Sequence, residues 1–134
     1  MNQESSEGTP EDKRAAATIA TSLSGYVMAG ALAVLGAEGA VFVFLLDKKI
    51  ITFAGWFLLL GTFLALVASC YLGGKGVWEI YASGARGDWK TTVQGKFALQ
   101  LLLALIGVLL FFGTAIAARY APEKPASPEH RLQS

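Results

Sequence analysis

Three long apolar stretches, separated by short groups of charged residues, dominate the chain. They cover residues 15–46, 51–72 and 97–118. A helix needs about 20 consecutive apolar residues to cross the hydrocarbon core of a bilayer. The stretches are continuously apolar, whereas the strands of a membrane barrel would alternate over about 10 residues. We therefore predict an all-α integral membrane protein with three transmembrane helices, at about residues 24–46, 51–72 and 97–118.

The segment between the second and third spans, residues 73–96, is the longest hydrophilic element. Gly73 and Gly74 favour termination of the second helix. Val77, Ile80 and Gly84 then share one helical face, so we predict a short amphipathic helix in the membrane interface. Lipid headgroups or a partner would contact four side chains of the segment 73–96: Trp78, Tyr81, Arg86 and Trp89. The alternative is a solvated connector.

The two ends of the chain are poor in apolar residues. Residues 1–14 are rich in Glu, Ser, Gly and Pro, and residues 121–134 contain three prolines among charges. Such segments bury too little apolar surface to offset the entropy lost on ordering. We predict disordered tails over 1–14 and 121–134, on either side of one transmembrane domain over 15–120.

Composition narrows the function classes. Only 16% of the 134 residues are charged and 54% are hydrophobic, whereas soluble domains carry about 25% charged residues. A net charge of +1 without a basic stripe argues against nucleic-acid binding. A single histidine and a single cysteine provide neither a haem-ligating pair nor a zinc cluster. We predict no enzyme activity, no cofactor and no metal.

Glu38 is the one charged residue within an apolar span. It precedes Leu46 by eight residues, or about 12 Å of helix, which places it near the middle of a core about 30 Å thick. An ionisable group at this depth is a candidate functional site. Counting from the turn at 47–50 places Thr62 at the same depth, and Thr114 is a second candidate partner.

Three interpretations of Glu38 remain open. It can be a protonated hydrogen-bond donor between helices, part of an ion or proton pathway, or the partner of a basic group from another subunit. No Lys, Arg or His occurs in the core of any span, so the chain itself offers Glu38 no cationic partner.

Small residues recur at spacings of three and four along the spans. Such faces allow close approach of helices in lipid. The candidate packing positions are Gly25, Ala29, Ala33 and Ala37 in the first span and Gly61 and Ala65 in the second. The small residues exceed what a three-helix unit can use, which favours self-association or docking to other membrane subunits.

Together these features predict a small multi-pass membrane protein that self-associates, with a pore or ion-conducting assembly as the functional interpretation. The alternative is a non-catalytic accessory or scaffold subunit of a larger membrane complex. Lysine and arginine number six on the side of the N-terminus and residues 73–96, against five on the other side. This bias predicts a cytoplasmic N-terminus, and we expect the protein in the plasma or inner membrane.

Overall fold

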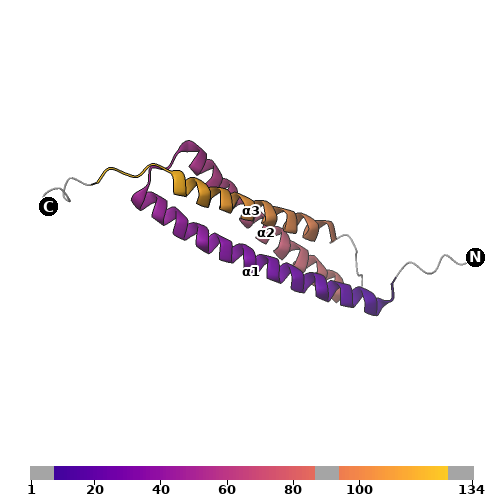
Figure 1. The fold of residues 1–134 in the computed structure, drawn as a ribbon. Helices are drawn as coiled ribbons and strands as arrows, with labels where there is room; N and C mark the ends of the chain where they lie inside the picture. The colour runs from indigo at the N-terminus through magenta and orange to yellow at the C-terminus, as the bar shows by residue number, and fades with distance from the viewer. Residues whose placement is uncertain (1–7, 87–93, 127–134) are drawn as a thin grey trace, which may run out of the picture.

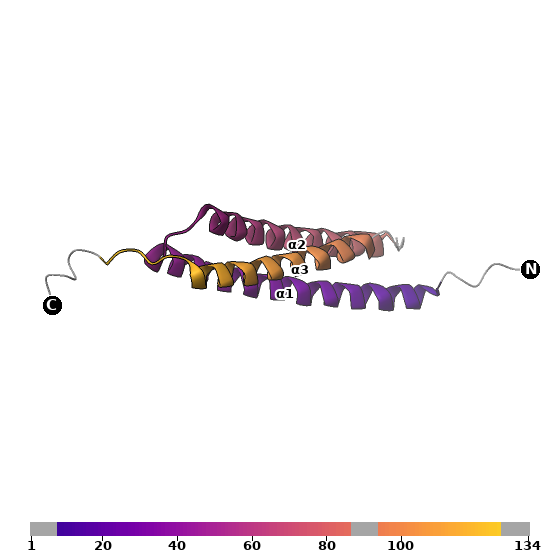
Figure 2. The same cartoon turned by 45° about the horizontal axis from the view of Figure 1, so that its top comes forward.

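The chain folds into three long helices that pack side by side, as the computed structural model shows over residues 8–86 and 94–126 (Figure 1). Helix α1 spans Pro10–Lys48, α2 spans Phe53–Ala85 and α3 spans Gln94–Tyr120. Each helix is long and apolar enough to cross a membrane, and no β-strand occurs in the described ranges. The helices run up, down and up, so the two termini lie at opposite ends of the bundle (Figures 1 and 2). This arrangement is compatible with the predicted multi-pass membrane protein.

Helix α1 begins earlier than the sequence suggested. Its first turn starts at Pro10, within the segment that we expected to be disordered. Thr9 accepts a hydrogen bond from the backbone N–H of Asp12 at 3.3 Å, and the Asp12 carboxylate accepts one from the Thr9 N–H at 3.1 Å. This reciprocal capping box, with proline in the first turn, stabilises the helix start. The N-terminal end of α1 extends past the start of α3 (Figure 1).

A seven-residue pattern of buried positions holds the bundle together. The buried residues of α1 are Ser24, Ala31, Glu38 and Leu45, which recur every seven residues. Those of α2 are Leu59, Thr62, Leu66, Ser69, Gly73 and Gly76, at alternating steps of three and four. This period keeps one seam of each helix facing its neighbours, as in left-handed coiled coils. The closest packing is between α2 and α3.

Helix α2 does not end at Gly73–Gly74 but continues to Ala85, which corrects the prediction of a separate interfacial helix. No such helix occurs in the described part of residues 73–96. A Cβ atom at Gly73 would lie 2.4 Å from Nε2 of Gln100, and one at Gly76 would lie 3.0 Å from the ring of Phe97. These glycines therefore serve close approach of α3, not helix termination. Residues 87–93 of the predicted interfacial segment lie outside the described residues.

The C-terminal segment after α3 contacts the turn between α1 and α2. The Ile50 N–H donates to the Pro122 carbonyl at 2.9 Å, and the Lys124 N–H donates to the Lys48 carbonyl at 3.0 Å. An ion pair of 3.1 Å joins Lys49 to Glu123. Residues 121–126 are thus anchored in part, whereas we expected a disordered tail from residue 121.

Candidate functional site

Glu38 lies in a groove between α1 and α2. The groove has a volume of about 410 Å³ and is partly open to the outside of the bundle. We call it the Glu38 groove; its lining residues are Leu35, Glu38, Gly39 and Phe42 of α1 and Trp56, Leu59, Leu60 and Phe63 of α2. The rings of Phe42 and Trp56 meet edge to face with centroids 5.8 Å apart. Glu38 is the one ionisable side chain in this apolar lining.

The Glu38 carboxyl group is buried without a hydrogen bond. Only 5% of the residue is exposed, and neither carboxyl oxygen has a hydrogen-bond partner among the described residues. A buried polar group without a partner is unfavourable, and a charged one is more so. A proton, or a ligand or partner that brings a complementary charge, would satisfy this group.

The two threonines predicted as partners of Glu38 bond elsewhere. Thr62 of α2 lies beside the Glu38 carboxyl group, as the depth count predicted. Its hydroxyl nevertheless donates to the Leu58 carbonyl in the preceding turn at 2.9 Å. Thr114 of α3 is buried and donates to the Leu110 carbonyl at 3.1 Å. Both threonine hydroxyls thus donate to carbonyl groups of their own helices, and within the described part of the chain Glu38 accepts no hydrogen bond from either.

A second buried polar site joins all three helices and was not found from the sequence. Ser24 of α1 donates to the side-chain oxygen of Gln100 at 2.8 Å, and the Gln100 amide donates back to the Ser24 carbonyl at 3.3 Å. Ser69 of α2 donates to the Gln100 carbonyl at 2.8 Å. We call these three residues the Gln100 cluster. Its reciprocal bonds give it a structural role, because both amide atoms of Gln100 are paired.

The small residues predicted for helix packing divide into two groups. Gly25, Ala29, Ala33 and Ala37 of α1 are all exposed in this unit. A Cβ atom at Gly25 would lie more than 4 Å from any neighbouring atom in the described ranges. At about 100° per residue, Ala29 lies about 180° around α1 from Glu38, so this stripe faces away from α2 and α3.

Gly61 and Ala65 of α2 are half-buried, and a Cβ atom at Gly61 would lie 3.4 Å from the Leu110 side chain of α3. The small residues of α2 are therefore partly covered within the three-helix bundle, whereas the small residues of α1 are exposed. The α1 positions remain predicted contact sites for another chain.

The predicted partner-contact residues lie near the C-terminal end of α2. Trp78 and Tyr81 are exposed, with ring centroids 6.0 Å apart. Arg86 caps the helix and donates to the Ala82 carbonyl at 3.1 Å. Trp89 lies outside the described residues. The structure brings Trp78 and Tyr81 together on the helix surface.

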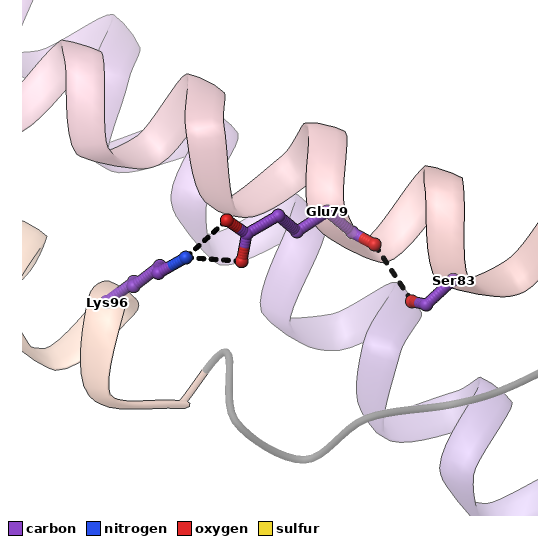
Figure 3. Close-up of polar contacts among 3 residues, drawn as sticks. All are labelled: Glu79, Ser83 and Lys96. Carbon is purple, nitrogen blue, oxygen red and sulfur yellow. Dashed lines mark hydrogen bonds and ion pairs between the residues drawn. The ribbon is translucent and has the colours of Figure 1, made fainter.

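An ion pair between α2 and α3 lies at this same end. The Lys96 ammonium contacts both carboxylate oxygens of Glu79, and the Ser83 hydroxyl donates to the Glu79 carbonyl at 2.8 Å (Figure 3). The hydrogen bond from Lys96 lowers the pKa of Glu79, and the positive charges of Lys96 and Lys75 act in the same direction. The pair links α2 to α3 beyond the apolar part of the bundle.

Comparison with known protein families, curated proteins and solved structures finds no match for this chain. The site must therefore be interpreted from its own geometry.

Sequence reasoning located Glu38 and Thr62 but missed the Gln100 cluster and the aromatic lining of the groove. A signal for the cluster exists, because the steps of three and four on α2 already place Thr62, Ser69, Gly73 and Gly76 on one seam. The groove has no comparable signal, since Phe42 and Phe63 resemble any other apolar residue of a span.

Proposed function

We propose that this protein is a small membrane protein that self-associates through the exposed small-residue stripe of α1. The supporting observation is the stripe itself: Gly25, Ala29, Ala33 and Ala37 are exposed along one side of the helix. In lipid, helices associate by close packing, and small residues permit that approach. The buried seam of α1 already serves the contacts within the unit, so the stripe is free for a second copy.

The assembly, rather than the single unit, would provide any ion path. The interior of one unit is filled at the level of Leu66, Thr62 and Gln100, each of which has at most 1% of its surface exposed. A path for ions would therefore run between copies. Because Glu38 faces away from the stripe, it would not line a path at that interface, and its role would be separate from the contact itself.

The mass of the complex purified in mild detergent tests self-association. We expect a multiple of the 14.2 kDa chain. The double variant Ala29→Leu/Ala33→Leu should shift the complex to the monomer, because the added side chains prevent close approach. Ala98→Leu on the exposed side of α3 is the matched control and should leave the mass unchanged. A monomer for the unmodified protein, or equal masses for the two variants, would overturn the proposal.

The alternative, an accessory subunit of a larger complex, predicts a different result in the same experiment. A foreign membrane subunit would account for the added mass, and the chain alone would be silent in a liposome ion-flux assay. Flux that is present and decreases for Ala29→Leu/Ala33→Leu would favour conduction by the assembly.

We also propose a plasma or inner membrane location with a cytoplasmic N-terminus. The support for the orientation is the excess of Lys and Arg, six against five, on the side of the N-terminus and of residues 73–96. Single cysteines at Ser5 and His130 in a chain lacking Cys70 test it. A membrane-impermeant thiol reagent added to intact cells should label position 130 and leave position 5 unlabelled.

A further inference from the structure

We propose that the Glu38 groove binds a hydrophobic organic cation, whose positive charge pairs with the Glu38 carboxylate. The groove volume of about 410 Å³ lies within the range of about 300–1,000 Å³ that small-molecule sites occupy. Such sites combine a mostly apolar lining with a few polar groups that orient the ligand. Here the lining supplies a single acidic group, Glu38, in otherwise apolar surroundings.

The charge of the ligand follows from the state of Glu38. Its two carboxyl oxygens are buried and have no hydrogen-bond donor among the described residues. Among the described residues, no Lys, Arg or His lines the groove, and Thr62 donates its hydroxyl to the Leu58 carbonyl. In its charged form, the carboxylate would lack the positive partner that a charged group in an apolar site requires. A cationic ligand supplies that partner.

The apolar character of the ligand follows from the rings around the acid. Phe42, Trp56 and Phe63 contribute aromatic surface to the groove. Aromatic faces attract cations, most strongly when water is excluded, and Trp is the strongest of the three types. An inorganic cation would need several oxygen ligands, which this lining does not offer. A monovalent organic cation with aryl or alkyl groups satisfies both the acid and the rings.

The bound cation and a proton would compete for the same group. When the site is empty, a proton neutralises Glu38; on binding, the carboxyl O–H bond breaks, the proton leaves to solvent, and the carboxylate pairs with the cation. No other ionisable side chain lines the groove from α1 or α2. Residues 97–118 of α3 contain no ionisable side chain. Proton release on binding is therefore assigned to Glu38.

Equilibrium binding of tetraphenylphosphonium to the full chain in mild detergent tests the proposal. We expect saturable binding, at most one ligand per chain, with tighter binding as pH rises. Glu38→Gln should weaken binding at least tenfold. Glu79→Gln removes a carboxylate outside the groove and is the matched control, so its affinity should equal that of the unmodified protein. Helix content by circular dichroism checks that each variant is folded.

A second pair of variants tests the aromatic wall. Trp56→Leu should weaken binding, whereas Trp78→Leu, at an exposed position on the same helix, should not. The neutral compound triphenylphosphine oxide should bind more weakly than the cation. Its affinity should be the same for the unmodified protein and for Glu38→Gln. Equal binding of neutral and charged probes would indicate a general lipid-facing groove and would overturn the proposal. So would equal affinities for Glu38→Gln and Glu79→Gln.

The proposal does not depend on self-association. Binding is measured per chain, so a monomeric protein that binds the cation would refute the assembly alone. An oligomer that does not bind it would refute the ligand site alone.

Discussion

The Gln100 cluster and the Glu38 groove are both buried between helices of one bundle, but their polar groups are satisfied to opposite extents. In the cluster, Gln100 exchanges two hydrogen bonds with Ser24 and accepts a third from Ser69. In the groove, both oxygens of Glu38 lack a partner among the described residues. The difference separates a polar contact that stabilises the fold from a polar group that lowers its stability.

The packing around the two sites differs in the same way. Next to the cluster, Gly73 and Gly76 allow α3 to lie directly against α2. Beside Glu38, α1 and α2 leave a groove of about 410 Å³ between them. Unsatisfied buried polar groups are rare in folded proteins, and those that occur concentrate at sites of function. The open, unsatisfied site is therefore the better candidate for binding.

The largest expected effect comes from adding one methyl group at the tight contact. Gly73→Ala would place Cβ 2.4 Å from the Gln100 amide nitrogen, which cannot move without breaking its bond to Ser24. We expect a loss of about 1–3 kcal/mol in the free energy of unfolding. Reversible unfolding in mixed micelles, followed by circular dichroism, measures it.

Gly74→Ala is the matched control for this change. A Cβ atom at Gly74 would meet no described residue within 4 Å, so this variant should gain up to about 1 kcal/mol from the higher helix propensity of alanine. Equal effects at Gly73 and Gly74 would show that the α2–α3 contact is looser than described.

The next effect tests whether the Gln100 cluster stabilises the bundle. Gln100→Met keeps the length of the side chain but removes both bonds to Ser24, whose hydroxyl then loses its acceptor. We expect a loss of about 1–2 kcal/mol in the free energy of unfolding, since interhelical hydrogen bonds in membranes contribute modestly. The same micelle assay measures it. An unchanged free energy of unfolding would show that the Gln100 cluster does not stabilise the bundle.

Substitution by methionine in the Glu38 groove should change the free energy of unfolding in the opposite direction. Glu38→Met removes a buried carboxyl group that makes no hydrogen bond and replaces it with an apolar side chain of similar length. We expect the free energy of unfolding to rise by about 1 kcal/mol, because the penalty for burying an unpaired polar group disappears. A decrease comparable to that of Gln100→Met would mean that Glu38 is an ordinary hydrogen-bonded core residue.

Much of the fold follows from the sequence because its main signals are local. Three apolar stretches of sufficient length predict three helices, and the short turn at 47–50 makes the first two antiparallel neighbours. The same turn sets a common depth for Glu38 and Thr62, so their proximity could be predicted by counting residues. The extent of α2 could not be predicted in this way. Whether Gly73 ends a helix or admits a neighbour depends on Gln100, 27 positions later.

Glu38 could be predicted from the sequence as a candidate functional residue, but the groove around it and the nearby buried polar contacts could not. Glu38 is conspicuous as a lone charge in an apolar span. Gln100 follows a hydrophilic segment and has its partner Ser24 76 positions away, so no local pattern joins them. The groove depends on how far α1 stands from α2, which side-chain packing decides after the helices form. The exposed stripe of α1 was visible as a spacing, but only the bundle shows that it faces outward.

The smallest expected effect concerns the ion pair at the exposed end of the α2–α3 hairpin. Glu79→Gln removes the charge that contacts Lys96, and the midpoint of thermal unfolding at neutral pH should fall by less than for Gly73→Ala. The pKa of Glu79 in the fold is lower than its ordinary value of 4.5. The stabilisation is therefore complete above that ordinary value and is lost as pH falls through the lowered pKa. Melting curves of both proteins across this range should converge at acid pH. A constant difference down to the lowest pH would show that Glu79 acts through packing rather than through its charge.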